Sequence, residues 1–74
     1  MKLYTKTICG KCMFVKSMIN GLGVDCEFIN MDENEEARQL VLAAGLMTAP
    51  VLEIDGELIG HEGEIMERLQ ALEG

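Results

Sequence analysis

The sequence lacks the features that mark membrane and secreted proteins. It has no apolar run long enough to span a bilayer. Its opening residues, MKLYT, also lack the apolar stretch of a signal peptide. We therefore expect a cytoplasmic protein with no membrane partner.

Cysteine is scarce too, with three residues in a chain of 74. In a cytoplasmic protein so few cysteines argue against a disulfide scaffold and for a redox or metal-binding role. A chain of this length makes a single domain, residues 1–74, whose core rarely supplies more than about 3–5 kcal/mol. We expect it to act as a monomer.

Acidic residues are absent from residues 1–22, which contain four lysines. The rest of the chain holds all thirteen carboxylates and two arginines, and the net charge is −7. One end of an acidic protein is therefore locally basic, which favours a thiolate there and disfavours nucleic acid as a partner. Lysines that merely solvate one helix face would give the same pattern.

Aromatic residues number only three, whereas the chain has six methionines. The thioether side chain is flexible and fills irregular gaps in a core. Because the methionines fall mainly within apolar stripes, we expect them to fill the core rather than to form a metal site.

A pair of cysteines three residues apart lies at the predicted start of the first helix. Cys12 belongs to an apolar stripe with Val15, Ile19 and Leu22, whose spacing is that of one buried helix face. Cys9 precedes this stripe. The pattern predicts that Cys9 faces solvent at the helix N-terminus and that Cys12 is covered by the helix.

This asymmetry suits thiol-disulfide exchange, in which a thiolate attacks a disulfide. A helix N-terminus and nearby cations lower a cysteine pKa from about 8.5 towards the range of about 3.5–7.5. Cys9 has Lys6 and Lys11 close in sequence, so we predict that it is the nucleophile and that Cys12 resolves the mixed disulfide. The alternative is a static disulfide or a packed pair of thiols, but a loop this short adds little stability.

The rest of the pattern predicts alternating strands and helices that form an α/β fold with both faces of its sheet covered. Helices are expected from near Gly10 to Gly21 or Gly23, after Asp32 and around Ile65. The predicted order is β-α-β-α-β-β-α, with a four-stranded mixed sheet. The predicted strands are residues 2–5, 24–31, 51–54 and 57–59.

Three local signals set the boundaries of these elements. Asp32 and Glu35 resemble a capping box at the start of the second helix. Gly45-Leu46 is typical of a Schellman end, in which a left-handed glycine is followed by an apolar contact. Asp55-Gly56 between two β-prone runs predicts a two-residue hairpin turn.

Three motifs together resemble the thioredoxin superfamily, and most closely its glutaredoxin family, which includes redoxins that donate electrons to ribonucleotide reductase. The motifs are Tyr4-Thr5-Lys6-x-x-Cys9-x-x-Cys12, Thr48-x-Pro50 and Ile54-Asp55-Gly56-x-x-Ile59-Gly60. The resemblance implies a minimal thioredoxin fold and a thiol-disulfide oxidoreductase that carries a redox-active Cys9–Cys12 disulfide and no bound cofactor.

The same resemblance implies how the substrate and the reductant bind. A cis Pro50 would face the dithiol, and the backbone of Ala49 beside Thr48 would pair with an extended protein segment. Gly60 and Glu64 would contact substrate or glutathione at the start of the last helix. The substrate would be a disulfide-containing protein such as ribonucleotide reductase, and the electron donor either glutathione or a thioredoxin-reductase-like enzyme.

The sequence departs from family patterns in two places, at one residue and over one short stretch. Leu3 stands where larger thioredoxins carry a buried acid, and Gly60-His61-Glu62-Gly63-Glu64 replaces the Gly-Gly-x-Asp-Asp-like stretch that holds glutathione in glutaredoxins. Each lost charge-assisted hydrogen bond costs roughly 1.5–3 kcal/mol. We therefore expect glutathione to be a weak reductant and a protein reductase to be preferred.

Two metal-based alternatives use the same cysteines. Cys9, Cys12, Cys26 and His61 could in number form a zinc site, but Cys26 is expected to alternate into a covered face of the second strand and His61 to be solvated or to cap a helix. A copper carrier also has a CxxC motif before its first helix. Such carriers run β-α-β-β-α-β and usually have methionine where this chain has Thr7.

Overall fold

The computed structural model describes residues 1–73. The described chain follows the predicted order β-α-β-α-β-β-α, and none of its helices is long and apolar enough to cross a membrane. The elements are β1 (Lys2–Thr5), α1 (Gly10–Leu22), β2 (Glu27–Asn30), α2 (Glu35–Ala43), β3 (Val51–Ile54), β4 (Glu57–Ile59) and α3 (Glu62–Glu73).

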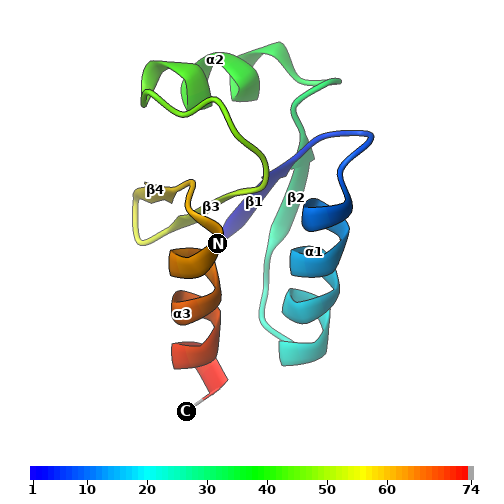
Figure 1. Cartoon of the computed structure of the whole chain (residues 1–74), viewed down its shortest axis with the longest axis vertical. Helices are drawn as coiled ribbons and strands as arrows, with labels where there is room; N and C mark the ends of the chain where they lie inside the picture. The colour runs from blue at the N-terminus through cyan, green and yellow to red at the C-terminus, as the bar shows by residue number, and fades with distance from the viewer. Residues whose placement is uncertain (74) are drawn as a thin grey trace.

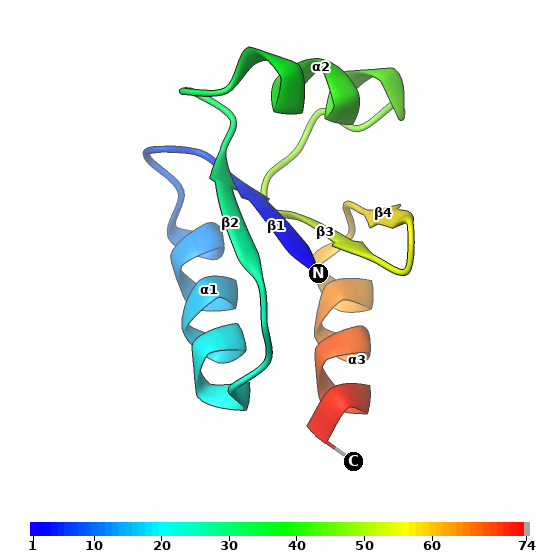
Figure 2. The same cartoon turned by 180° about the vertical axis from the view of Figure 1, so that it is seen from behind.

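The four strands form one mixed sheet in the order β2-β1-β3-β4. β1 and β2 are parallel, as expected of strands joined through a helix, whereas β3 is antiparallel to both β1 and β4. In both views α1 and α3 run side by side, and α2 lies crosswise at the end of the molecule opposite the C-terminus (Figures 1 and 2). The predicted minimal thioredoxin fold is confirmed.

Two apolar clusters hold these layers together, one on each face of the sheet. Leu3 and Tyr4 are neighbours on β1 and point to opposite faces, and both are buried. Leu3 packs with residues of α1 and α3, whereas Tyr4 packs with residues of α2. A central strand that is apolar on both sides therefore fixes the positions of all three helices.

Local turn chemistry sets the path of the chain into β3 and β4. The Leu46 amide donates to the Val41 carbonyl (3.2 Å) and the Gly45 amide to the Leu42 carbonyl (2.9 Å), with Gly45 at φ 81°. This is the predicted Schellman end. The hairpin is confirmed as well, because Asp55 and Gly56 both have positive φ, at 52° and 79°.

The predicted capping box at Asp32 is wrong. Asn34 caps α2, since its Oδ1 accepts the Ala37 amide at 3.0 Å, a contact that typically stabilises a helix by about 1 kcal/mol. The Asp32 carboxylate instead accepts the backbone amide of Thr7 at 2.9 Å. Because the Asp32 carboxylate bonds the loop after β1, it does not cap α2.

Other predicted boundaries and stripes are also shorter than expected. The second strand begins at Glu27 rather than Val24, so Cys26 lies just before it. Leu40 of α2 and Leu72 of α3 are apolar but exposed. The spacing of apolar residues gives the face on which they lie, but not how far a neighbouring element extends to cover them.

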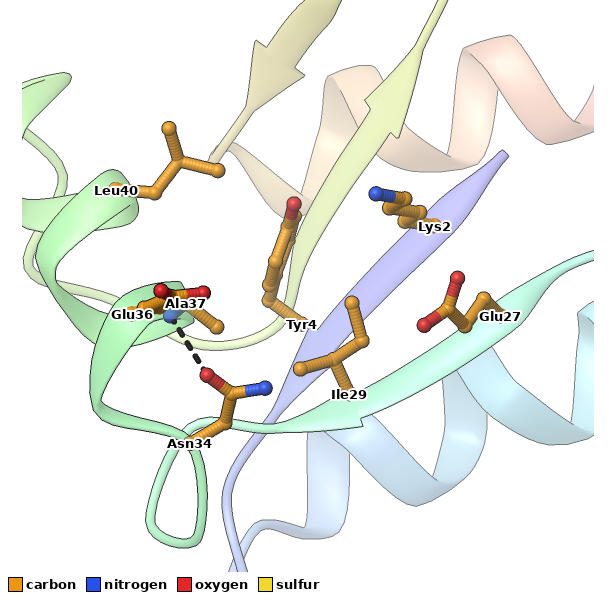
Figure 3. A pocket seen from close by; sticks show the side chains of 8 residues that line it. All are labelled: Lys2, Tyr4, Glu27, Ile29, Asn34, Glu36, Ala37 and Leu40. Carbon is orange, nitrogen blue, oxygen red and sulfur yellow. Dashed lines mark hydrogen bonds between the residues drawn. The ribbon is translucent and has the colours of Figure 1, made fainter.

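A cavity of about 370 Å³ lies between α2 and the first two strands (Figure 3). Tyr4 and Ile29 line it from the sheet, and Asn34 and Leu40 from the α2 side. The Tyr4 hydroxyl donates to Glu53 at 2.8 Å, and burial is the main reason why the pKa of Tyr4 rises to about 12. The cavity is not lined by either cysteine of the CxxC pair.

Candidate active site

Cys9 and Cys12 form a disulfide at the start of α1, with their Cα atoms 5.2 Å apart. Cys9 is the N-cap residue in extended conformation, and its Sγ accepts the Cys12 amide at 3.1 Å. The positive end of the helix therefore points at the Cys9 sulfur, which favours a thiolate after reduction.

The two sulfur atoms differ in access. Cys12 is 2% exposed and lies with the fully buried Val15 and Ile19, as the helical stripe predicts. Cys9 is partly exposed rather than fully solvent-facing. Cys9 is therefore the more accessible residue of the pair, and Cys12 lies inside the protein.

A set of polar contacts fixes the loop that carries Cys9. The Thr7 amide donates to Asp32, and the Asn30 side chain donates to the Thr7 hydroxyl at 3.1 Å. The Asp32 amide in turn donates to Asn30 Oδ1 at 2.8 Å. The Thr7 hydrogen bonds are the main reason why the pKa of Asp32 lies below its usual value, with smaller effects from Lys6 and Arg38.

Asn30 and Asp32, which hold this loop, were not among the predicted site residues. Their signal was present, because Asn30 ends and Asp32 closely follows a strand that a helix joins to β1, a connection typical of parallel strands. The carboxyl ends of parallel strands lie at the same edge of a sheet. The two residues and the loop after β1 should therefore meet.

The two lysines proposed to tune Cys9 have different surroundings. The Lys11 amino group lies 3.5 Å from a Glu62 carboxylate oxygen, so this ion pair joins the starts of α1 and α3. Lys6 and Arg38 instead line a cavity of about 210 Å³. The effect of Lys11 on a thiolate is thus partly offset by Glu62. No local sequence signal predicts this Lys11–Glu62 ion pair.

The Ala49–Pro50 peptide bond is cis, as the family resemblance implies. Pro50 is buried, Ala49 is partly exposed and Thr48 is exposed. Val51 pairs with Tyr4 near the end of β1. This register places residues 48–50 at the edge of the sheet from which the chain leads to Cys9.

Gly60 and Glu64, the remaining residues of the predicted site, contact different partners. A Cβ atom at Gly60 would lie 2.9 Å from the Leu46 side chain and 3.2 Å from that of Thr48, so glycine permits a close approach to the segment before Pro50. Glu64 lies 3.7 Å from Arg68 on α3, and Arg68 also bonds Glu57 at 2.9 Å. Gly60 therefore borders the segment that leads to Pro50, whereas Glu64 belongs to a surface ion pair network.

Three apolar side chains are exposed next to the motif residues. Ile8 is 96% exposed, Met13 71% and Met47 90%, and they are neighbours in sequence of Cys9, Cys12 and Thr48 respectively. The prediction that methionines fill the core is therefore wrong for Met13 and Met47. We call these three residues the apolar rim.

The third cysteine is separate from this site. Cys26 lies just before β2, at the opposite end of that strand from Asn30, and packs against the core. Burial is the main reason why the pKa of its thiol is raised. Within residues 1–73 no three histidine, cysteine or acidic side chains come together as a metal site.

Comparisons with known proteins agree with this geometry. The Glutaredoxin family model matches residues 1–59. No curated protein sequence gives a significant match. The observed element order also differs from the β-α-β-β-α-β order of small copper carriers, which argues against that alternative.

Solved structures give similar matches. The chain is 26% identical to the glutaredoxin-like NrdH-redoxin of Escherichia coli, described as having a thioredoxin-like activity profile (TM-score 0.75; 89% of this chain and 90% of that one). It is 28% identical to buckwheat glutaredoxin in complex with glutathione (0.76; 97% and 69%). It is 29% identical to the holo form of glutaredoxin C1 from Populus tremula x tremuloides (0.74; 97% and 75%).

Proposed function

Because this chain belongs to the glutaredoxin family and is a thiol-disulfide oxidoreductase, we propose that it reduces disulfides of protein substrates by a dithiol mechanism. Cys9 is the nucleophile and Cys12 the resolving residue. The observation that carries this proposal is the asymmetric disulfide, with an accessible sulfur at the N-cap of α1 and a buried one a turn inside.

The reaction takes two exchange steps. The Cys9 thiolate attacks one sulfur of the substrate disulfide, which forms a mixed disulfide and releases the other sulfur as a thiolate that takes a proton from solvent. The Cys12 thiolate then attacks Cys9, which releases the second substrate thiol. Two electrons pass to the substrate, and the Cys9–Cys12 disulfide remains for a reductant to open.

The apolar rim favours a protein substrate over a small polar one. Burial of Ile8 or Met47 against a partner would contribute up to about 1.5–3 kcal/mol for each side chain. An extended substrate segment would pair with the backbone of Ala49 beside Pro50, as in strand addition. Ribonucleotide reductase is one candidate, since a glutaredoxin-like NrdH-redoxin has a similar structure.

The start of α3 bears on the choice of electron donor. Glu62 lies here with its carboxylate turned to Lys11, and Gly63 offers no acid to pair with the ammonium of glutathione. A glutathione carboxylate at this point would be repelled by Glu62. We therefore favour a thioredoxin-reductase-like enzyme as donor, with the reaction in the cytosol and the protein as a monomer.

Glutathione is the alternative donor, and one structural observation supports it. Lys6, Arg38 and Thr48 line the cavity of about 210 Å³, and two cations with a hydroxyl suit a peptide carboxylate. A similar solved structure, buckwheat glutaredoxin, is a complex with glutathione.

Two coupled assays on the same oxidised protein would test the proposal. One supplies NADPH and thioredoxin reductase, and the other NADPH, glutathione reductase and glutathione; both use a disulfide-bonded protein as acceptor. We expect turnover in the first assay at a rate well above the second, and none with Cys9→Ser in either. Turnover that survives Cys9→Ser would refute the dithiol mechanism, whereas faster turnover with glutathione would reverse only the choice of donor.

A further inference from the structure

A third cavity, of about 230 Å³, is lined by Cys12 but not by Cys9. We call it the Cys12 cavity. It lies among the end of β1, the loop after it, α1 and the end of β2, and its polar lining includes Thr5, Lys6, Lys16 and Asn30.

The step in which Cys12 attacks Cys9 requires a path by which the Cys12 proton can leave. Cys12 must become a thiolate to attack Cys9, but it is 2% exposed and burial disfavours the charged form of a thiol. Leu3 supplies no acid from β1, and the described residues that line the cavity include no carboxylate. The proton must therefore leave without a neighbouring acidic residue to accept it.

The cations around Cys12 are not equivalent. Lys11 is paired with Glu62 on α3, and Lys6 lies within the electrostatic influence of Asp32 after β2. Lys16 makes no ion pair with any of residues 1–73. It therefore supplies the least compensated positive charge of the cavity.

Phe28 of β2 contacts the Lys16 side chain. The Lys16 amino group lies 5.0 Å from the centroid of the Phe28 ring, within the range of a cation–π contact. Lys16 follows Cys12 by four residues on α1, so the two side chains lie on adjacent turns of one helix face.

We propose that the Cys12 cavity is the route by which the Cys12 proton leaves, and that Lys16, assisted by Lys6, stabilises the thiolate that remains. The inference rests on the proposed dithiol function. The Cys12 thiol gives its proton to solvent water in the cavity, and its sulfur then attacks Cys9. The bond between Cys9 and the substrate breaks, and the departing substrate sulfur takes a proton from solvent.

The first test measures the acidity of Cys12 without any turnover. In the Cys9→Ser, Cys26→Ser protein Cys12 is the sole thiol, and the ultraviolet absorbance of its thiolate is followed against pH. Lys16→Met should raise the midpoint by about half a pH unit, as expected for loss of one partly screened charge. Lys16→Arg should restore the midpoint, and circular dichroism confirms that each variant is folded.

Lys2→Met is the matched control, because it removes the same charge from the far end of β1, beside the cavity in Figure 3. We expect its midpoint to equal that of the parent protein. If Lys16→Met moves the midpoint no more than Lys2→Met does, the proposed role of Lys16 is wrong. Equal shifts from both would mean that net charge alone sets the acidity.

The second test follows a single turnover of the reduced Cys26→Ser protein with a small neutral disulfide. Lys16→Met should slow release of the second thiol about twofold at neutral pH, because the rise in Cys12 nucleophilicity offsets part of the loss of thiolate. Release of the first thiol, which reports attack by Cys9, should be unchanged. An equal slowing of both would contradict the inference, whereas absence of any turnover in the parent protein would instead refute the proposed function.

Discussion

Cys9 and Cys26 are both partly exposed cysteines, and they lie at opposite ends of the parallel pair β1 and β2. Cys26 packs against the core before β2, and burial raises the pKa of its thiol. Cys9 instead caps α1 and accepts the Cys12 amide. The two cysteines are similarly exposed. We therefore expect their reactivity to differ because the Cys9 sulfur caps a helix N-terminus and the Cys26 sulfur does not.

The largest expected effect comes from removing each cysteine in turn. Cys9→Ser should abolish reduction of a disulfide-bonded protein, whereas Cys26→Ser should leave turnover intact. Cys12→Ser should allow Cys9 to be trapped as a mixed disulfide, which intact-mass spectrometry would detect. Loss of activity in a folded Cys26→Ser protein would break the contrast between the two ends.

The start of α3 lies near Cys9 and not near Cys26, because Glu62 pairs with Lys11 at the start of α1. Changes there should therefore affect only the Cys9 end of the molecule. Restoring a family-like pattern with His61→Gly and Gly63→Asp should raise glutathione-dependent turnover at least about tenfold, the equivalent of one charge-assisted hydrogen bond. The measurement is the glutathione reductase assay on both proteins. A parent protein that already turns over rapidly with millimolar glutathione would overturn this account of α3.

A smaller effect is expected from the contacts that hold the Cys9 loop. Asp32→Asn weakens the bond to the Thr7 amide, so the alkylation rate of Cys9 at pH 7 should fall a few-fold while that of Cys26 stays the same. Asn34→Ala, which removes the α2 cap beside it, is the matched control for lost stability. Equal changes in Cys9 reactivity from both variants would argue against a specific role for Asp32.

The acid dependence of stability gives a further, smaller test of the same contact. The pKa of Asp32 is lowered in the folded protein, chiefly by the Thr7 amide, so its contribution is present above the unfolded pKa of about 3.9 and is lost as pH falls through the lower folded value. Thermal unfolding measured below about pH 4 should therefore show a smaller loss of stability for Asp32→Asn than for the parent. Parallel curves would contradict the role of this carboxylate.

Features that depend on neighbouring residues could be predicted from the sequence. The Schellman end at Gly45-Leu46, the turn at Asp55-Gly56 and the buried stripe of Cys12 all follow from local backbone chemistry or helical spacing. For the same reason the CxxC pair could be assigned before its geometry was known. The cis bond before Pro50 was implied only by the family resemblance.

Features that depend on partners distant in sequence could not be predicted from local spacing alone. Asp32 and Asn34 are both residue types that cap helices. Asp32 instead accepts the Thr7 amide from the loop between β1 and α1, so Asn34 caps α2. Met13 and Met47 are apolar but exposed, because no described element covers them. A hydrophobic pattern identifies an apolar side chain, but not whether it meets the core or a partner.

The most direct test of the central claim compares the two ends within one molecule. The reduced protein is treated briefly with iodoacetamide at pH 7, and the modified cysteines are identified by mass spectrometry of peptides. Because only Cys9 combines access with a helix N-terminus, it should be alkylated far faster than Cys12 or Cys26. Modification of Cys26 before Cys9, or of both at the same rate, would contradict the account.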